Sequence, residues 1–257
     1  MTTRQIPRAA TLCLFCAAML TACNSPQPAA PPRSPESAQQ SNNPQPDLGA
    51  SRESAREPEA PGRTSRNARR ARPSAISQPG VFDFYLLTLS WSPEFCATHS
   101  GSPECSAHPG FVVHGLWPQN NDGTYPENCS TAPGPANPGQ YTNLLPTVSL
   151  VQHEWTTHGT CSGLAPDAYF AQIGSAFHAL HIPADFTGNS QPATLTPNSI
   201  SADFTAANPS LPPASVAISC GRNYLTAVEV CLSKTLQPEA CQSVHTCGAT
   251  VVKVTSR

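Results

Sequence analysis

Two histidines and a glutamate lie close together in the segment "HEWTTH", residues 153–158. The zinc-hydrolase helix motif H-E-x-x-H separates its histidines by four residues, so that both can face one metal ion. His153 and His158 are five residues apart, which corresponds to about 140° around an ideal helix, and this spacing disfavours a shared metal. Glu154 and His158 are four residues apart and share a helix face. The arrangement is better suited to proton transfer and anion recognition.

A second segment, "FVVHGLWPQNNDGTYPENC" at residues 111–129, supplies a partner for this chemistry. A phosphodiester displacement needs an acid for the leaving oxygen as well as a base. His114 ends a predicted strand just before a glycine, where its side chain can project into a cleft. Trp117 and Tyr125 offer flat surfaces on which a nucleobase could stack.

The elements that would position these residues follow from composition and hydrophobic spacing. Short apolar, β-branched or aromatic runs predict strands, and apolar residues at helical spacing predict helices. Strands are predicted over 81–91, 110–115, 215–220, 224–233 and 248–254, helices over 147–159, 165–180 and 196–208, and a long loop over 120–140. Because strands and helices mix without βαβ alternation, we expect an α+β domain, with a mainly antiparallel central sheet and packed helices.

The N-terminal part of the chain has a different composition. Residues 1–23 read as a signal peptide that ends in "LTAC", which resembles a bacterial lipobox and would make Cys23 the lipid-modified first residue. An ordinary export signal is the alternative. Residues 24–79 are rich in proline, serine and arginine and predict a disordered tether. Residues 80–257 contain every aromatic residue except Phe15, so the folded domain is expected there.

Charge and cysteine content narrow the possible classes. The domain at 80–257 has 4 Lys and Arg against 11 Asp and Glu, a net charge of −7, whereas the tether has a net charge of +3. A domain that holds long nucleic acid by its phosphates is normally basic, so any RNA must be held locally or with help from the tether. Eight cysteines in an exported domain imply four disulfides, whose pairing the count alone leaves open.

The segments "FVVHGLWP" (111–118) and "LVQHEWTTHGTC" (150–161) are similar to the two active-site segments of the T2 family of ribonucleases. The similarity extends across 81–257. It implies a metal-independent endoribonuclease that cleaves single-stranded RNA. The ribose 2′-OH would attack the adjacent phosphorus and leave a 2′,3′-cyclic phosphate.

The resemblance also implies roles for individual residues. His158 would be the general base that takes the 2′-OH proton, and His114 the general acid that protonates the departing 5′-oxygen. Glu154 would hold the imidazoles and the phosphate in place, and His153 would contact a phosphate oxygen. The implied activity needs no cofactor and no metal, and its bell-shaped pH profile would report the histidine pair.

The chain departs from the family at two positions of the substrate site. Thr157 stands where the family usually has lysine or arginine, so electrostatic stabilisation of the phosphate should be weaker. Gln119 stands where many relatives carry an aspartate that reads the base, and its mixed donor and acceptor groups imply low base specificity. Tyr125 and Leu150 would line the two base sites.

The family implies the four disulfides Cys129–Cys161, Cys96–Cys105, Cys220–Cys247 and Cys231–Cys241. The expected partner is RNA and not DNA. Membrane contact is expected only through a lipid anchor, and the chain is expected to be a monomer. The chain is expected either as a lipoprotein on the periplasmic side of the outer membrane or as a soluble periplasmic or secreted protein. Two alternatives remain: a ribonuclease-like RNA-binding or signalling module with weak activity, and a zinc hydrolase.

Overall fold

The computed structural model describes residues 72–74, 77–107, 110–187 and 191–257. The predicted signal peptide, the lipobox with Cys23 and most of the predicted tether lie outside these residues. Within the described part of the chain, no helix combines the length and apolarity needed to cross a membrane.

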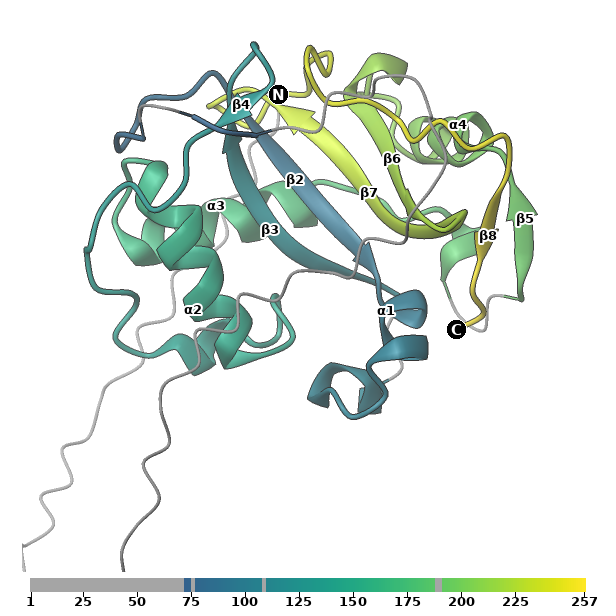
Figure 1. Ribbon diagram of the computed structural model, residues 1–257, viewed down its shortest axis with the longest axis horizontal. Helices are drawn as coiled ribbons and strands as arrows, with labels where there is room; N and C mark the ends of the chain where they lie inside the picture. Colours follow the sequence, from purple (N-terminus) through teal and green to yellow (C-terminus); the bar gives the residue numbers. More distant parts are fainter. Residues whose placement is uncertain (1–71, 75–76, 108–109, 188–190) are drawn as a thin grey trace, which may run out of the picture. The chain divides into compact units, whose positions relative to one another are not determined.

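A six-stranded sheet forms the centre of the domain (Figure 1). Its strands run in the order β3-β2-β7-β8-β5, and β6 also pairs with β7. The strands are β2 (Phe84–Trp91), β3 (Phe111–Gln119), β5 (Ala193–Leu195), β6 (Val216–Gly221), β7 (Tyr224–Leu232) and β8 (Val252–Val254). All pairs are antiparallel except β7 with β8. The predicted α+β class with a mainly antiparallel sheet is therefore confirmed.

Among the residues that the structure describes, four α-helices accompany the sheet: α1 (Ser92–Thr98), α2 (Val148–Thr157), α3 (Pro166–His178) and α4 (Pro197–Ala207). Helices α2 and α3 lie beside β3, and α4 lies beside β6 (Figure 1). The main core joins the apolar faces of α3 and α4 to the sheet residues that alternate inward, such as Leu87, Leu89 and Val113. This alternation leaves the other face of β2, β3 and β7 free to carry the polar side chains of a site.

The strand with the first active-site segment is longer than predicted. Strand β3 continues past residue 115 to Gln119, although Pro118 lacks a backbone N–H. The proline is tolerated because β3 ends the strand order and pairs only with β2. Helix α1 and strand β5 are among the elements that were not predicted. Pro93 and Glu94 in the first turn of α1 were the available signals for the helix.

The end of the predicted tether also contains regular structure. Arg72–Pro73 forms β1, which pairs in parallel with β4, Thr124–Tyr125. Ser74 N–H donates to the Tyr125 carbonyl at 2.7 Å. Strand β1 thus lies within the predicted tether, before the expected boundary at 79/80, and it borders the strand that carries Tyr125.

Four disulfides join the described cysteines, in the pairing that the family resemblance implied: Cys96–Cys105, Cys129–Cys161, Cys220–Cys247 and Cys231–Cys241. The Cys129–Cys161 bond ties the loop after β4 to the turn that follows α2. Two hydrogen bonds lie beside it, from Asn128 N–H to the Thr157 carbonyl at 2.8 Å and from Cys129 N–H to Thr160 Oγ1 at 3.2 Å.

Candidate active site

His114 is the extra residue of a β-bulge. Thr88 of β2 lies opposite Gly115, and Leu89 lies opposite Val113, so His114 has no partner in the register. A bulge redirects the side chain at that position. The His114 side chain is 40% exposed, and the Ser90 hydroxyl oxygen lies 3.0 Å from its Nδ1. The bulge thus turns a histidine out of the strand alternation and toward α2.

Helix α2 supplies the second group of polar side chains. Its first turn is capped by Thr147, whose hydroxyl accepts from Leu150 N–H at 3.1 Å. The helix ends at Thr157, and His158 follows as the C-cap with a φ of −113°. His158 N–H still donates to the Glu154 carbonyl at 3.0 Å, but the φ of His158 departs from the helical value, and its ring centroid lies 6.2 Å from that of His153.

This helix end changes the argument about metal binding. The possible ligand atoms of His153, Glu154 and His158 lie within 4.8 Å of one another, so this group could hold a metal ion. The angle of about 140° applies only to an ideal helix, which α2 is not at His158. The spacing of these residues therefore does not exclude a metal ion. An experiment must distinguish a metal site from an acid–base site.

Trp117 contacts both His114 of β3 and the polar side chains at the end of α2. Its indole Nε1–H donates to Glu154 Oε2 at 2.8 Å. Its ring stacks on that of His158, with centroids 5.0 Å apart and planes 27° apart, and meets His114 edge-on at 5.3 Å. Glu154 Oε1 lies 3.6 Å from His114 Nε2. Trp117 was predicted as a platform for a base, and the structure adds that it holds the three candidate catalytic side chains in place.

Gly115 makes this close approach possible. A Cβ at this position would lie 1.9 Å from Glu154 Oε2 and 2.4 Å from Trp117 Nε1. Any side chain there would occupy the space of the hydrogen bond between the two residues. The glycine that follows His114 is thus required by contact with the site.

Burial controls the charges of the site. Although the His114 side chain is 40% exposed, the partial burial of its ring against the site lowers its pKa to about 4, with a further contribution from His153. Burial and the neighbouring His153 and His114 lower the pKa of His158 to about 3. Burial raises the pKa of Glu154 to about 8, although the Trp117 hydrogen bond partly opposes this rise. At neutral pH His114 and His158 are therefore uncharged beside a mostly protonated Glu154, which suits the approach of an anion.

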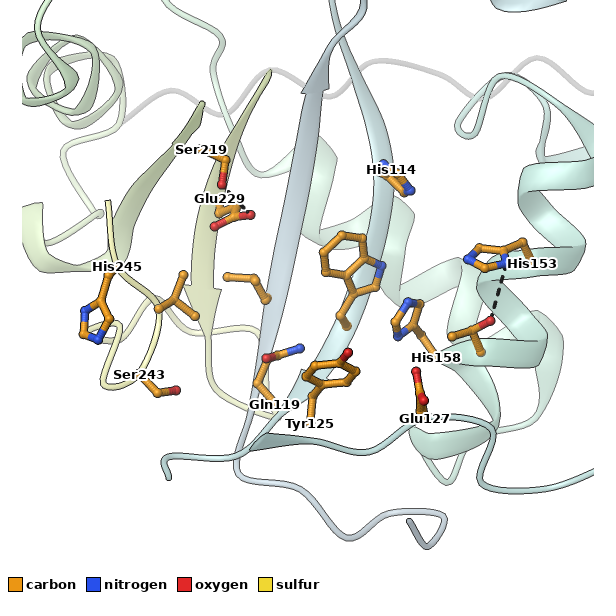
Figure 2. Close-up of a pocket in the computed structure, with 14 residues that line it drawn as sticks. His114, Gln119, Tyr125, Glu127, His153, His158, Ser219, Glu229, Ser243 and His245 are labelled. Atoms are coloured by element: carbon orange, nitrogen blue, oxygen red, sulfur yellow. Dashed lines mark hydrogen bonds between the residues drawn. The ribbon is translucent and has the colours of Figure 1, made fainter. Parts of the chain in front are cut away.

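A cavity of about 670 Å³ opens in front of these residues (Figure 2). One end is formed by Thr157 together with His114, His153 and His158. The Thr157 hydroxyl oxygen lies 3.5 Å from His153 Nδ1. Trp117, stacked on His158, is part of the lining, Tyr125 and Gln119 lie next along the cavity, and the far side reaches Glu229 on β7 (Figure 2). The predicted substrate residues Trp117, Gln119, Tyr125, His153 and Thr157 thus share one cavity.

A second cavity, of about 620 Å³, lies on the other side of His114. It shares His114 and His153 with the first cavity, and Leu150 lines it rather than the first. His158 lines only the first cavity. The shared histidines therefore stand where the two cavities meet.

Sequence reasoning missed several residues of the site, among them Ser90, Gly115 and Glu229. Ser90 and Gly115 are explained only by the bulge and by a contact between distant segments. Glu229 had a visible signal, because it is the single charged residue in the otherwise apolar strand "YLTAVEVCL".

Comparison with known proteins agrees with this geometry. Residues 82–241 match the ribonuclease T2 family. A ribonuclease from Aeromonas hydrophila is 46% identical over 93 residues, which are 35% of this chain and 43% of that protein. Ribonuclease DdI from Dictyostelium discoideum is 30% identical over 181 residues, which are 62% of this chain and 77% of that protein.

Among solved structures, a variant of RNase MC1 in complex with 5′-GMP matches with a TM-score of 0.52 and 26% identity. The match covers 66% of this chain and 98% of that one. Fold and sequence together define an α+β ribonuclease-like domain. The chain belongs to the ribonuclease T2 family. The match covers less than half the length of the Aeromonas relative.

Proposed function

We propose that the chain is a metal-independent endoribonuclease that cleaves single-stranded RNA by transphosphorylation. The observation that carries the proposal is the meeting of His114, Glu154 and His158 around Trp117, with both histidines lining the first cavity. Two imidazoles on opposite sides of one position suit the transfer of a proton to one oxygen and from another. Membership of the ribonuclease T2 family supports the same reaction.

In the proposed reaction, the nucleophile belongs to the substrate. His158 takes the proton of the ribose 2′-OH, and the 2′-oxygen forms a bond to the adjacent phosphorus. The bond from phosphorus to the 5′-oxygen then breaks, and His114 donates a proton to that oxygen. The products are a 2′,3′-cyclic phosphate end and a free 5′-OH. DNA lacks the 2′-OH and is not a substrate.

The two cavities determine which nucleoside of the substrate lies on which side of the catalytic histidines. His158 lines only the first cavity, so the nucleoside that supplies the 2′-OH is assigned there, with Trp117, Gln119 and Tyr125. The leaving nucleoside is assigned to the second cavity, where Leu150 lies. Gln119 is 6% exposed and presents both donor and acceptor groups, which suits low base specificity.

Glu154 and His153 act on the phosphate in this proposal. Glu154 Oε1 has no hydrogen-bond partner and is fully buried, so it is available to the phosphate or to a protonated His114. A neutral carboxyl avoids repelling the phosphate and can donate to it, which is consistent with the raised pKa. His153 is exposed and borders both cavities, where it can contact a phosphate oxygen.

We further propose that the chain is exported, with Cys23 as the lipid-bearing residue of an N-terminal anchor and a tether before the domain, and that it acts as a monomer. The lipobox-like "LTAC" and the four disulfides support an oxidising compartment outside the cytoplasm.

The test is product analysis with the purified full chain and a defined oligoribonucleotide in EDTA. We expect 2′,3′-cyclic phosphate ends, no cleavage of the matching oligodeoxyribonucleotide, and at least a thousandfold loss in His114→Ala and His158→Ala, the order of magnitude for loss of a proton-transfer group. His178→Ala, an exposed histidine of α3, is the control and should keep full activity. Loss of activity in EDTA would instead support a metal site at His153, Glu154 and His158. RNA binding without cleavage would support the binding-module alternative.

A further inference from the structure

Glu229 lies in the first cavity, but the proposed reaction gives it no role. It is on β7, opposite Thr88 of β2, and Thr88 is in turn opposite Gly115 of β3. Glu229 therefore lies two strand spacings, roughly 10 Å, from β3, the strand that carries His114. In Figure 2, Glu229 and Ser219 lie across the cavity from His153 and His158.

The surroundings of Glu229 leave its carboxyl group without a cation. Ser219 donates its hydroxyl to Glu229 Oε1 at 3.0 Å. No ion pair to Glu229 is found among the described residues, and its pKa responds to burial and to Ser219 rather than to a basic side chain. Burial raises its pKa, and the Ser219 hydrogen bond opposes the rise. A half-buried carboxyl without a cation is costly to fold, and such groups are concentrated where a ligand uses them.

A carboxylate selects among ligands by its acceptor atoms. It repels a phosphate and accepts hydrogen bonds from N–H groups. Guanine presents two adjacent donors, N1–H and the 2-amino group, to the two oxygens of one carboxylate. Uracil presents a single N–H between two carbonyl oxygens, and cytosine and adenine place a ring-nitrogen acceptor beside their amino group. An ionised Glu229 therefore fits the guanine edge best.

Resting on the proposed function, we propose that Glu229 is a specificity-determining residue that reads the base of the 2′-OH nucleoside and favours guanine. Trp117 and Leu86 line the cavity between the histidines and Glu229, so a base lying over them directs its far edge toward Glu229. Ser219 holds the carboxyl in this orientation. The preference adds to the weak discrimination expected from Gln119.

Glu127 provides a matched control. It is a second carboxyl that lines the same cavity, but it lies beside His158, on the opposite wall from Glu229 (Figure 2). Glu127→Gln and Glu229→Gln remove the same charge with nearly the same shape. A general electrostatic effect on the cavity would appear in both variants, whereas base reading would appear only in Glu229→Gln.

The experiment compares kcat/KM for GpU, ApU, CpU and UpU with the full chain. We expect Glu229→Gln to lower the ratio of GpU to UpU by about tenfold, a typical loss for one bidentate base contact. Cleavage of UpU should stay within about twofold, because one base contact is lost and the proton-transfer groups are intact. Ser219→Ala should lower the ratio less, and Glu127→Gln should leave it unchanged. An equal change for all four substrates, or no preference for GpU in the unmodified chain, would overturn the proposal.

Binding separates this proposal from the proposed function. Titration with 3′-GMP and 3′-UMP measures base preference without catalysis. A guanine preference that disappears in Glu229→Gln supports the assignment even if the chain cleaves nothing. RNA cleavage together with equal affinity for both nucleotides in every variant would leave the ribonuclease function standing and refute the role of Glu229.

Discussion

The substitution Gly115→Ala tests whether the hydrogen bond between Trp117 and Glu154 holds the site together. The added Cβ would stand 1.9 Å from Glu154 Oε2 and 2.4 Å from Trp117 Nε1. To reach an ordinary contact of 3.4 Å, the carboxylate must retreat by about 1.5 Å and the indole by about 1.0 Å. The two groups cannot both move and keep their distance of 2.8 Å, because Glu154 is fully buried.

The cost follows from this displacement. Loss of a hydrogen bond to a buried carboxyl group costs about 1.5–3 kcal/mol of stability. A displacement of about 1 Å in a catalytic arrangement can lower the rate on the order of a hundredfold. We therefore expect Gly115→Ala to lower Tm by several degrees and kcat/KM for a dinucleotide by roughly a hundredfold.

Thermal denaturation and dinucleotide kinetics measure both effects, with Gly101→Ala as the control because a Cβ at Gly101 meets nothing within 4 Å. Glu154→Ala removes the nearer clashing group, so Gly115→Ala should cost clearly less stability in that background. If Gly115→Ala retains activity within about threefold of the unmodified chain, the reasoning from this contact is wrong, since a shift of about 1 Å should cost far more.

Two further predictions concern the charges of the site. Because burial lowers the pKa of His114 to about 4 and of His158 to about 3, kcat/KM should be highest below pH 6.5 and should fall as rising pH removes the His114 proton. The optimum of kcat should lie at higher pH, since bound phosphate favours the charged imidazole, and a kcat/KM optimum above pH 7 would contradict the assignment. Thr157→Lys should raise kcat/KM by about tenfold, because it supplies a charge-assisted contact to the phosphate. Thr157→Gln is its uncharged control, and an equal gain in both variants would argue against electrostatics.

The sequence predicted most of the fold where local patterns determine structure. The strands at 81–91 and 224–233 and helices α2, α3 and α4 follow from apolar spacing, and their observed ends differ by only a few residues. The pairing of β1 with β4 was not predictable, because Arg72 and Pro73 have no strand pattern of their own and adopt this structure only beside Thr124 and Tyr125.

The site was predictable in its residue types but not in its geometry. His114 and Glu154 stand out by type and position, yet the bulge that exposes His114 is a property of pairing with β2. The position of His158 depends on how α2 ends. Gly159, the next residue, packs so closely that a Cβ there would lie 2.5 Å from Trp155. The pairing of β2 with β3 and the contact of Gly115 with Glu154 join distant segments, and no local pattern encodes them.

The Cys129–Cys161 bond has a consequence for the cell that makes this protein. The bond closes at the turn after His158, so oxidation of both thiols adds a covalent anchor to a helix end that hydrogen bonds already hold. Thiols stay reduced in the cytoplasm. A newly made chain should therefore hold its site less firmly while it is still among the cell's own transcripts and ribosomes. Oxidation outside the cytoplasm would then fix the active site only where the enzyme no longer meets the cell's own RNA.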